Sequence, residues 1–365
     1  MKYNKGEWSE AYAFVKLLGE GKVYAADSEL NKNEDEYYPV LKIIRDKIEK
    51  HYVRSQQEQI VNITDLSGNI IKSLSSKEFI KVADDVLDDI KNKNGSSFEV
   101  PDLENFLKGL DNISFKAPSK EKSDFTMEIY DYRIQQSKIH TFSVKSYLGD
   151  NPTLLNASQA TRFIYNISNI SENEVKELNK IEGRKKLKAR FGKIVEKIDD
   201  KSYVVTFEKI ESDIFESNLR LIDSNLKYIV AELLMKFYST ENNSNIKKLT
   251  EQIIEKNPLN IPDVDKKLFY KTKVTELIKA ATLGMVPNRK WNKEYDVTGG
   301  ILSVKKNGEV LCYHMFYSRD SLDEYLYENT YLETPSTSRH KFGEIYYEDG
   351  KHYFKLNLQI RIKQP

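Results

Sequence analysis

The 365-residue chain contains a single cysteine, Cys312, and therefore cannot form an internal disulfide. It has no apolar run near the roughly 18 residues that a membrane-spanning helix needs. Its first residues, Met-Lys-Tyr-Asn-Lys-Gly-Glu, lack the apolar segment of a signal peptide. From these absences we expect an intracellular, cytoplasmic protein in a reducing environment.

An excess of charge of one sign is also missing, because 57 Lys and Arg residues face 56 Asp and Glu residues, for a formal net charge of +1. Any contact with nucleic acid therefore depends on a local basic cluster. The histidines are dispersed without zinc-ligand spacing, and the chain has neither a glycine-rich phosphate loop nor a Ser-His-Asp order. With 39% hydrophobic residues, the chain can still build a core for one large or two ordinary domains.

Hydrophobic periodicity and turn signals predict an α/β protein. From about residue 299 the pattern changes to strands, with hairpin turns at Asn307-Gly308 and Asp349-Gly350. We expect a first region at residues 1–240, and a helical and β-rich region at 241–365. No linker marks this boundary, so a single domain stays open. The expected helices cover residues 7–19, 38–53, 173–197, 213–238, 244–256 and 264–283.

Two strand-like segments follow one another closely and carry an acid and a lysine. Asp124 begins the first segment, and residues 141–146 form the second. Ser143 and Lys145 point the same way, because alternate residues of a strand share a face. A hairpin would bring Asp124 beside them, which is the arrangement of the metal-dependent site in PD-(D/E)xK nucleases. The alternative is an ordinary hairpin that carries one acid and one lysine.

Hydrolysis of a phosphodiester at neutral pH needs a hard cation such as Mg²⁺, which binds oxygen ligands. Asp124 supplies one carboxylate, and Lys145 can hold or deprotonate the attacking water. Ser143 stands where a second acid is usual, so we expect another carboxylate from Glu10 or Glu7, three residues apart on the first helix. Alternatively, Glu7 stabilises the N-terminus of that helix.

Two polar clusters are candidates for contact with DNA. The first, a run of lysines and arginines at residues 184–197, can bind DNA phosphates without distinguishing base sequence, or it can be a solvated surface. The other, at residues 336–341, offers an arginine suited to guanine, or it is a plain polar loop. The first cluster contains Arg184, Lys185, Lys186, Lys188, Arg190, Lys193 and Lys197, and the second contains Arg339, His340 and Lys341.

Several runs along the chain resemble the HpaII-type restriction endonucleases. They include Lys5–Glu10, Tyr24–Asp27, Phe142–Gly149, Thr153–Ser158, Thr298–Gly300, Leu311–His314, Glu333–Gly343 and Lys355–Gln359. The resemblance implies a PD-(D/E)xK-like core with a central mixed sheet flanked by helices, plus a C-terminal β-rich region. Residues 1–240 would then be the nuclease core with DNA-contacting helices, and 241–365 would help to recognise DNA. The resemblance places Asp124 and Lys145 at catalytic positions and Ser143 at the commonly acidic one. Asn156 and Ser158 join the basic residues as expected DNA contacts, and Arg339, Lys341 and Asn156 are the expected base readers.

The resemblance also implies a type II enzyme that uses Mg²⁺ to cut double-stranded DNA at a short palindrome and is paired with a DNA methyltransferase. The name-giving member of the family cuts within CCGG. A homodimer would match the symmetry of a palindrome. Two other functions stay open: a sequence-specific DNA-binding protein with a degenerate site, suggested by Ser143, and a scaffold for protein contacts, suggested by the balanced charge.

Overall fold

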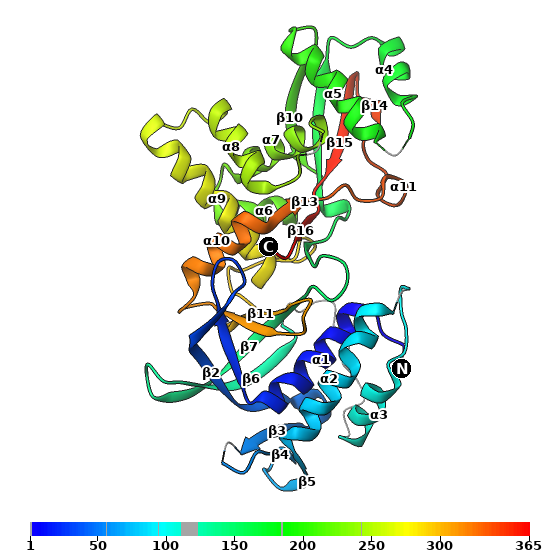
Figure 1. The fold of residues 1–365 in the computed structure, drawn as a ribbon. Helices are drawn as coiled ribbons and strands as arrows, with labels where there is room; N and C mark the ends of the chain where they lie inside the picture. Colours follow the sequence, from blue (N-terminus) through cyan, green and yellow to red (C-terminus); the bar gives the residue numbers. More distant parts are fainter. Residues whose placement is uncertain (1, 56, 94, 111–122, 184, 242) are drawn as a thin grey trace. The chain divides into compact units, whose positions relative to one another are not determined.

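The computed structural model describes residues 2–55, 57–93, 95–110, 123–183, 185–241 and 243–365 (Figure 1). Two compact units make up the chain, and each combines separated stretches. Unit 1 contains Met1–Pro152, Tyr295–Tyr325 and Gln364–Pro365, and unit 2 contains Thr153–Glu294 and Leu326–Lys363. The predicted division of roles at residue 240 stays a prediction.

Unit 1 is built around a nine-stranded mixed sheet. Most neighbouring strands are antiparallel, whereas β7 with β11 and β1 with β12 are parallel. This sheet and its helices confirm the predicted mixed α/β architecture. In spatial order the strands are β1 (Lys22–Ala26), β12 (Val310–His314), β11 (Gly300–Val304), β7 (Gln136–Ser146), β6 (Phe125–Asp131), β2 (Lys32–Arg45), β3 (Lys50–Ser55), β4 (Ile60–Thr64) and β5 (Ile70–Ser75).

Helix α1 (Lys5–Glu20) confirms the helix predicted at 7–19. Asn4 and Glu7 form a capping box at its N-terminus, which satisfies amide groups that the helix leaves unpaired. Its apolar face enters the core of unit 1 with Trp8 and Phe14, and α1 runs beside α2 (Ser76–Asn92) (Figure 1). Among the described residues, unit 1 also contains α3 (Pro101–Gly109) and most of α10 (Arg319–Asn329). The strands predicted from about residue 299 onward did not include α10.

The helix predicted at 38–53 is wrong. The region forms the end of β2, a short 3₁₀ helix η1 (Asp46–Ile48) and β3. The register of β2 against β6 shifts between Val40 and Lys42, as at a β-bulge. In β2 the buried residues are Tyr38, Pro39, Val40 and Ile43, and the last two have the three-residue spacing that is typical of a helix face.

Unit 2 contains two smaller sheets and seven helices in its described residues. One sheet has the order β10 (Val204–Ile210), β9 (Arg162–Ser168), β15 (Lys351–Asn357), β14 (Ile345–Glu348), and the other β13 (Thr330–Leu332), β16 (Ile360–Ile362), β8 (Thr153–Leu155). A 3₁₀ helix, η2 (Gln159–Thr161), precedes β9. The helices are α4 (Glu172–Asn179), α5 (Lys186–Asp199), α6 (Asp213–Ile222), α7 (Leu226–Ser239), α8 (Ile246–Lys256), α9 (Asp263–Leu283) and α11 (Thr337–His340).

Most predicted helices of unit 2 are present, but two are divided. The stretch 213–238 forms α6 and α7, because Asp223 has an extended backbone and its side chain accepts from the Asn225 amide at 2.8 Å. The stretch 173–197 forms α4 and α5. Both predicted hairpin turns are confirmed, with Gly308 and Gly350 at positive φ. Over the described ranges, no helix combines the length and apolarity needed to cross a membrane.

Candidate active site

Strands β6 and β7 form the predicted antiparallel hairpin, with Phe125 opposite Phe142. Asp124 directly precedes β6, and its amide donates to the Phe142 carbonyl at 2.8 Å. The pairing therefore continues by one residue beyond the strand. This places Asp124 beside Ser143 and confirms that the two segments come together.

A chain of hydrogen bonds joins Asp124, Ser143 and Lys145. The Lys145 ammonium donates to the Ser143 hydroxyl at 2.6 Å, and that hydroxyl donates to Asp124 Oδ2 at 3.2 Å. The same carboxylate oxygen accepts from the Val144 amide at 2.6 Å. Ser143 is buried, with 1% of its surface exposed, so it is a neutral bridge between the acid and the lysine.

Glu10 on α1 interacts electrostatically with this group of side chains. Burial, followed by repulsion from Asp124, raises the pKa of Glu10 to about 9, although Lys145 and Arg45 oppose the shift. Burial lowers the pKa of Lys145, and attraction to Asp124 and Glu10 opposes that change. The structure therefore brings together the two acids and the lysine that the sequence placed in one site.

The donor set suits a magnesium ion better than a soft metal. The described part of the chain has no cluster of three or more His, Cys, Asp or Glu side chains that could form a complete protein cage. Magnesium, however, is usually held by one or two carboxylates, with water and substrate phosphate completing the shell. Asp124 and Glu10 can supply these two carboxylates, and their mutual repulsion is what a bound cation would relieve.

Glu7 has a local structural role in α1. Its carboxylate accepts from the Asn4 amide at 2.8 Å, which completes the capping box. It also contributes to the raised pKa of Glu10, so it lies near the site. Its role as a metal ligand stays a prediction.

Among the expected DNA contacts, Asn156 is exposed, and Ser158 precedes η2 with a buried hydroxyl that has no hydrogen-bond partner within the described ranges. Lys185 lies 3.4 Å from Glu241, and Lys186 lies 3.6 Å from Glu182. These pairs leave both lysines near the surface. Arg184 lies outside the described residues.

Lys188 and Arg190 are held inside unit 2 by backbone carbonyls. Lys188 donates to Phe237 and to Thr240, and burial lowers its pKa to about 8. Arg190 is 1% exposed, and its guanidinium donates to the carbonyls of Leu178, Asn179 and Gly343. Both cations therefore bond to the fold itself, and burial of Arg190 argues against its contact with a phosphate; the expected DNA contact of Lys188 stays a prediction.

The spacing of α5 contained a signal for this burial. Leu187, Arg190, Phe191 and Ile194 form its buried stripe, so Arg190 stands at an apolar position of the helix. A cation in such a stripe needs hydrogen-bond acceptors inside the protein. The basic run alone did not distinguish this residue from its exposed neighbours.

The cluster at 336–341 forms the short helix α11 and its C-terminal turn. Arg339 is exposed, whereas the His340 carbonyl accepts from Arg162 at 2.6 Å. Burial and the positive charges of Arg339 and Arg162 lower the pKa of His340. Lys341 has a left-handed backbone with φ 44°.

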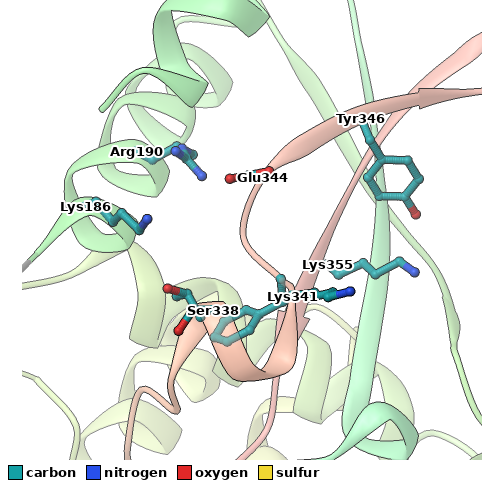
Figure 2. A pocket seen from close by; sticks show the side chains of 9 residues that line it. Lys186, Arg190, Ser338, Lys341, Glu344, Tyr346 and Lys355 are labelled. Atoms are coloured by element: carbon teal, nitrogen blue, oxygen red, sulfur yellow. The ribbon is translucent and has the colours of Figure 1, made fainter. Parts of the chain in front are cut away.

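Lys341 and Lys186 line one pocket of about 530 Å³, which also contains Lys355 and Tyr346 (Figure 2). The structure thus brings together Lys186 and Lys341, one residue from each basic cluster, although they lie 155 positions apart in the chain. Lys355 was missed as a site residue, because a single lysine in an alternating strand has no distinguishing pattern.

The model of the HpaII restriction endonuclease family matches residues 4–362. The chain belongs to the HpaII restriction endonuclease family. One relative, the type II restriction enzyme HpaII of Haemophilus parainfluenzae, is 39% identical over 363 residues and covers 98% of each chain. No solved structure has significant similarity to this HpaII-family chain.

Family membership confirms the resemblance seen in the sequence runs. This HpaII-family chain is a site-specific endonuclease: a DNA-binding hydrolase of a restriction system.

Proposed function

We propose that this HpaII-family enzyme makes magnesium-dependent double-strand cuts at a short palindromic DNA site and leaves 5′-phosphate and 3′-hydroxyl ends. The contact chain from Lys145 through Ser143 to Asp124, with Glu10 close enough to repel Asp124, is the observation that supports this proposal. It combines oxygen ligands for a hard cation with a lysine at the same place.

The proposed chemistry divides the work among four side chains. Asp124 and Glu10 hold the cation, which when bound supplies Lewis-acid stabilisation of the phosphoryl oxygens. Lys145 orients the attacking water and offsets negative charge that develops on the phosphate. Ser143 accepts from Lys145 and donates to Asp124, so it fixes their separation without adding charge.

The target proposed first is CCGG, on the basis of the family resemblance. Asn156 and Arg339 are the proposed base readers, Ser158 and His340 are further proposed DNA contacts, and exposed lysines hold phosphates. A palindromic target favours a twofold dimer, because the two copies then meet equivalent half-sites. A DNA methyltransferase of the same specificity would protect the host.

A DNA-binding protein with a degenerate nuclease site is the second candidate, and Ser143 in place of an acid is the observation that favours it. Incubation of purified protein with unmethylated phage DNA, with Mg²⁺ or with EDTA, separates the two. Discrete fragments that require Mg²⁺ support the endonuclease, and sequencing their termini gives the target and the cut position. Sequence-specific binding without cutting at any Mg²⁺ concentration would instead support the degenerate site.

A further inference from the structure

We propose that the pocket between α5, the turn after α11 and strand β15 binds a backbone phosphate of the DNA substrate, and that Lys341, Lys355 and Lys186 hold it. All of its lining residues belong to unit 2. This inference rests on the proposed function, because it takes DNA as the substrate. It adds Lys355 to the binding residues and assigns Lys341 to phosphate rather than to a base.

Charge in the pocket is strongly unbalanced compared with the whole chain. Four cationic side chains line it, including the three lysines and Arg190, and Glu344 is the acidic one. The chain as a whole has a formal charge of +1. Figure 2 shows Lys186 and Arg190 extending from α5 on one side, with Lys341 and Lys355 on the other. A concave site with an excess of positive charge concentrates the potential of its cations, which favours an anion.

Lys341 is the cation most available to a ligand. It is exposed, and its ammonium has no hydrogen bond or ion pair among the described residues. Its left-handed backbone, with φ 44°, is a conformation that glycine or asparagine would adopt at lower cost. The fold therefore keeps a lysine at a position where glycine or asparagine would cost less backbone strain.

The other two lysines have partners that leave positive charge in excess. Lys186 lies 3.6 Å from Glu182, whose side chain is 76% exposed, so solvent weakens this pair. Lys355 lies 3.2 Å from Glu211, but Glu211 also pairs with Arg162 at 3.1 Å. One carboxylate thus serves two cations, and the combined charge of these three groups is positive.

The chemistry of the lining favours a phosphate over a base. Thr337 and Ser338 add hydroxyl donors near the lysines, as phosphate sites often do. Paired contacts to a base edge come from planar side chains such as Arg, Asn or Gln, and also from lysine to guanine, so the comparison of cognate and non-cognate DNA decides between a base and a phosphate. Among the described lining residues only Arg190 is one of these planar side chains, and its guanidinium is occupied by backbone carbonyls.

The decisive variant is Lys341→Gly, which removes the charge and relieves the left-handed backbone. Equilibrium binding is measured in EDTA over a range of salt concentrations, with cognate DNA and with DNA that lacks the site. We expect weaker binding to both DNAs by the same factor, and a slope of log K against log salt that is shallower by about 1. Thermal unfolding should show unchanged or increased stability, because the strain is gone.

Two matched variants complete the test. Lys341→Arg keeps the charge and should keep the slope, whereas Lys267→Gln removes an exposed lysine of α9 outside the pocket and should leave the slope unchanged. An unchanged slope in Lys341→Gly, or a loss confined to cognate DNA, would overturn the proposal. Cutting of unmethylated DNA by the wild-type enzyme in Mg²⁺ tests the proposed function separately, so the two failures are distinguishable.

Discussion

Replacing Glu10 by glutamine should make the metal-free protein more stable at alkaline pH. In the folded protein, burial and the nearby Asp124 raise the pKa of Glu10 to about 9 from an ordinary 4.5. Between these pH values the folded state keeps a proton that the unfolded state has lost. The free energy of unfolding contributed by Glu10 therefore falls as the pH rises through this window.

The size of the effect follows from the pKa difference. Each pKa unit corresponds to about 1.4 kcal/mol, but solvent screening around this partly exposed carboxylate reduces the full value. We expect Glu10→Gln to raise the free energy of unfolding by roughly 1–3 kcal/mol at pH 8, with little change near pH 5. Glutamine has nearly the same shape and cannot ionise, so packing should change little.

Urea unfolding in EDTA at several pH values, followed by circular dichroism, measures this directly. Adding Mg²⁺ at pH 8 should stabilise the wild type, because a bound cation favours ionised Glu10, and should stabilise Glu10→Gln much less. Glu7→Gln is the matched control: it removes a carboxylate from the same helix while its amide can still close the capping box. Parallel pH profiles for wild type and Glu10→Gln would refute the reasoning, and a larger loss of Mg²⁺ response in Glu7→Gln would make Glu7 the ligand.

Three further predictions concern cutting and recognition. Asp124→Asn still accepts from the Val144 amide, so it should keep specific DNA binding in a gel-shift assay but lose Mg²⁺-dependent cutting; retained cutting would remove Asp124 from the site. Ser143→Asp should lower the Mg²⁺ concentration for half-maximal cutting, because it adds a carboxylate where the serine hydroxyl lies 2.6 Å from the Lys145 ammonium; an unchanged Mg²⁺ titration would contradict this. Arg339→Ala, if the arginine reads guanine, should weaken cognate binding by about 1–3 kcal/mol; an equal loss on all DNA would make it a phosphate contact.

The catalytic hairpin could be predicted from the sequence because its geometry is local. Residues 124–146 form one antiparallel pair, and the side-chain alternation of a strand fixes which residues share a face. Glu10 is different, since it precedes Asp124 by more than 100 residues. Its approach to the site depends on how α1 packs in unit 1, and the sequence favoured Glu10 over Glu7 only because Glu10 lies next to the apolar stripe of the helix.

The prediction failed where the sheet departs from regular alternation. In β2 the shift in register near Val40 changes the burial spacing, and the run was interpreted as a helix. Pairing with β6 and β3 overrides that local pattern, because both neighbours satisfy the backbone of β2. A bulge of this kind has no residue type that identifies it in one sequence.

The roles of the basic residues also could not be predicted from the sequence alone. A list of lysines and arginines does not say which ones face solvent: Arg190 occupies an apolar position of α5 and bonds to carbonyls, while Lys341 extends from a left-handed turn without a partner in the described structure. Lys355 of β15 lines the same pocket as Lys341, because the chain turns back between β14 and β15. Charge availability is therefore a property of the folded chain. It depends on which hydrogen-bond acceptors the fold brings within reach of each cation. The composition counts Arg190 and Lys341 alike, but only the folded structure shows that Arg190 is bonded to carbonyls.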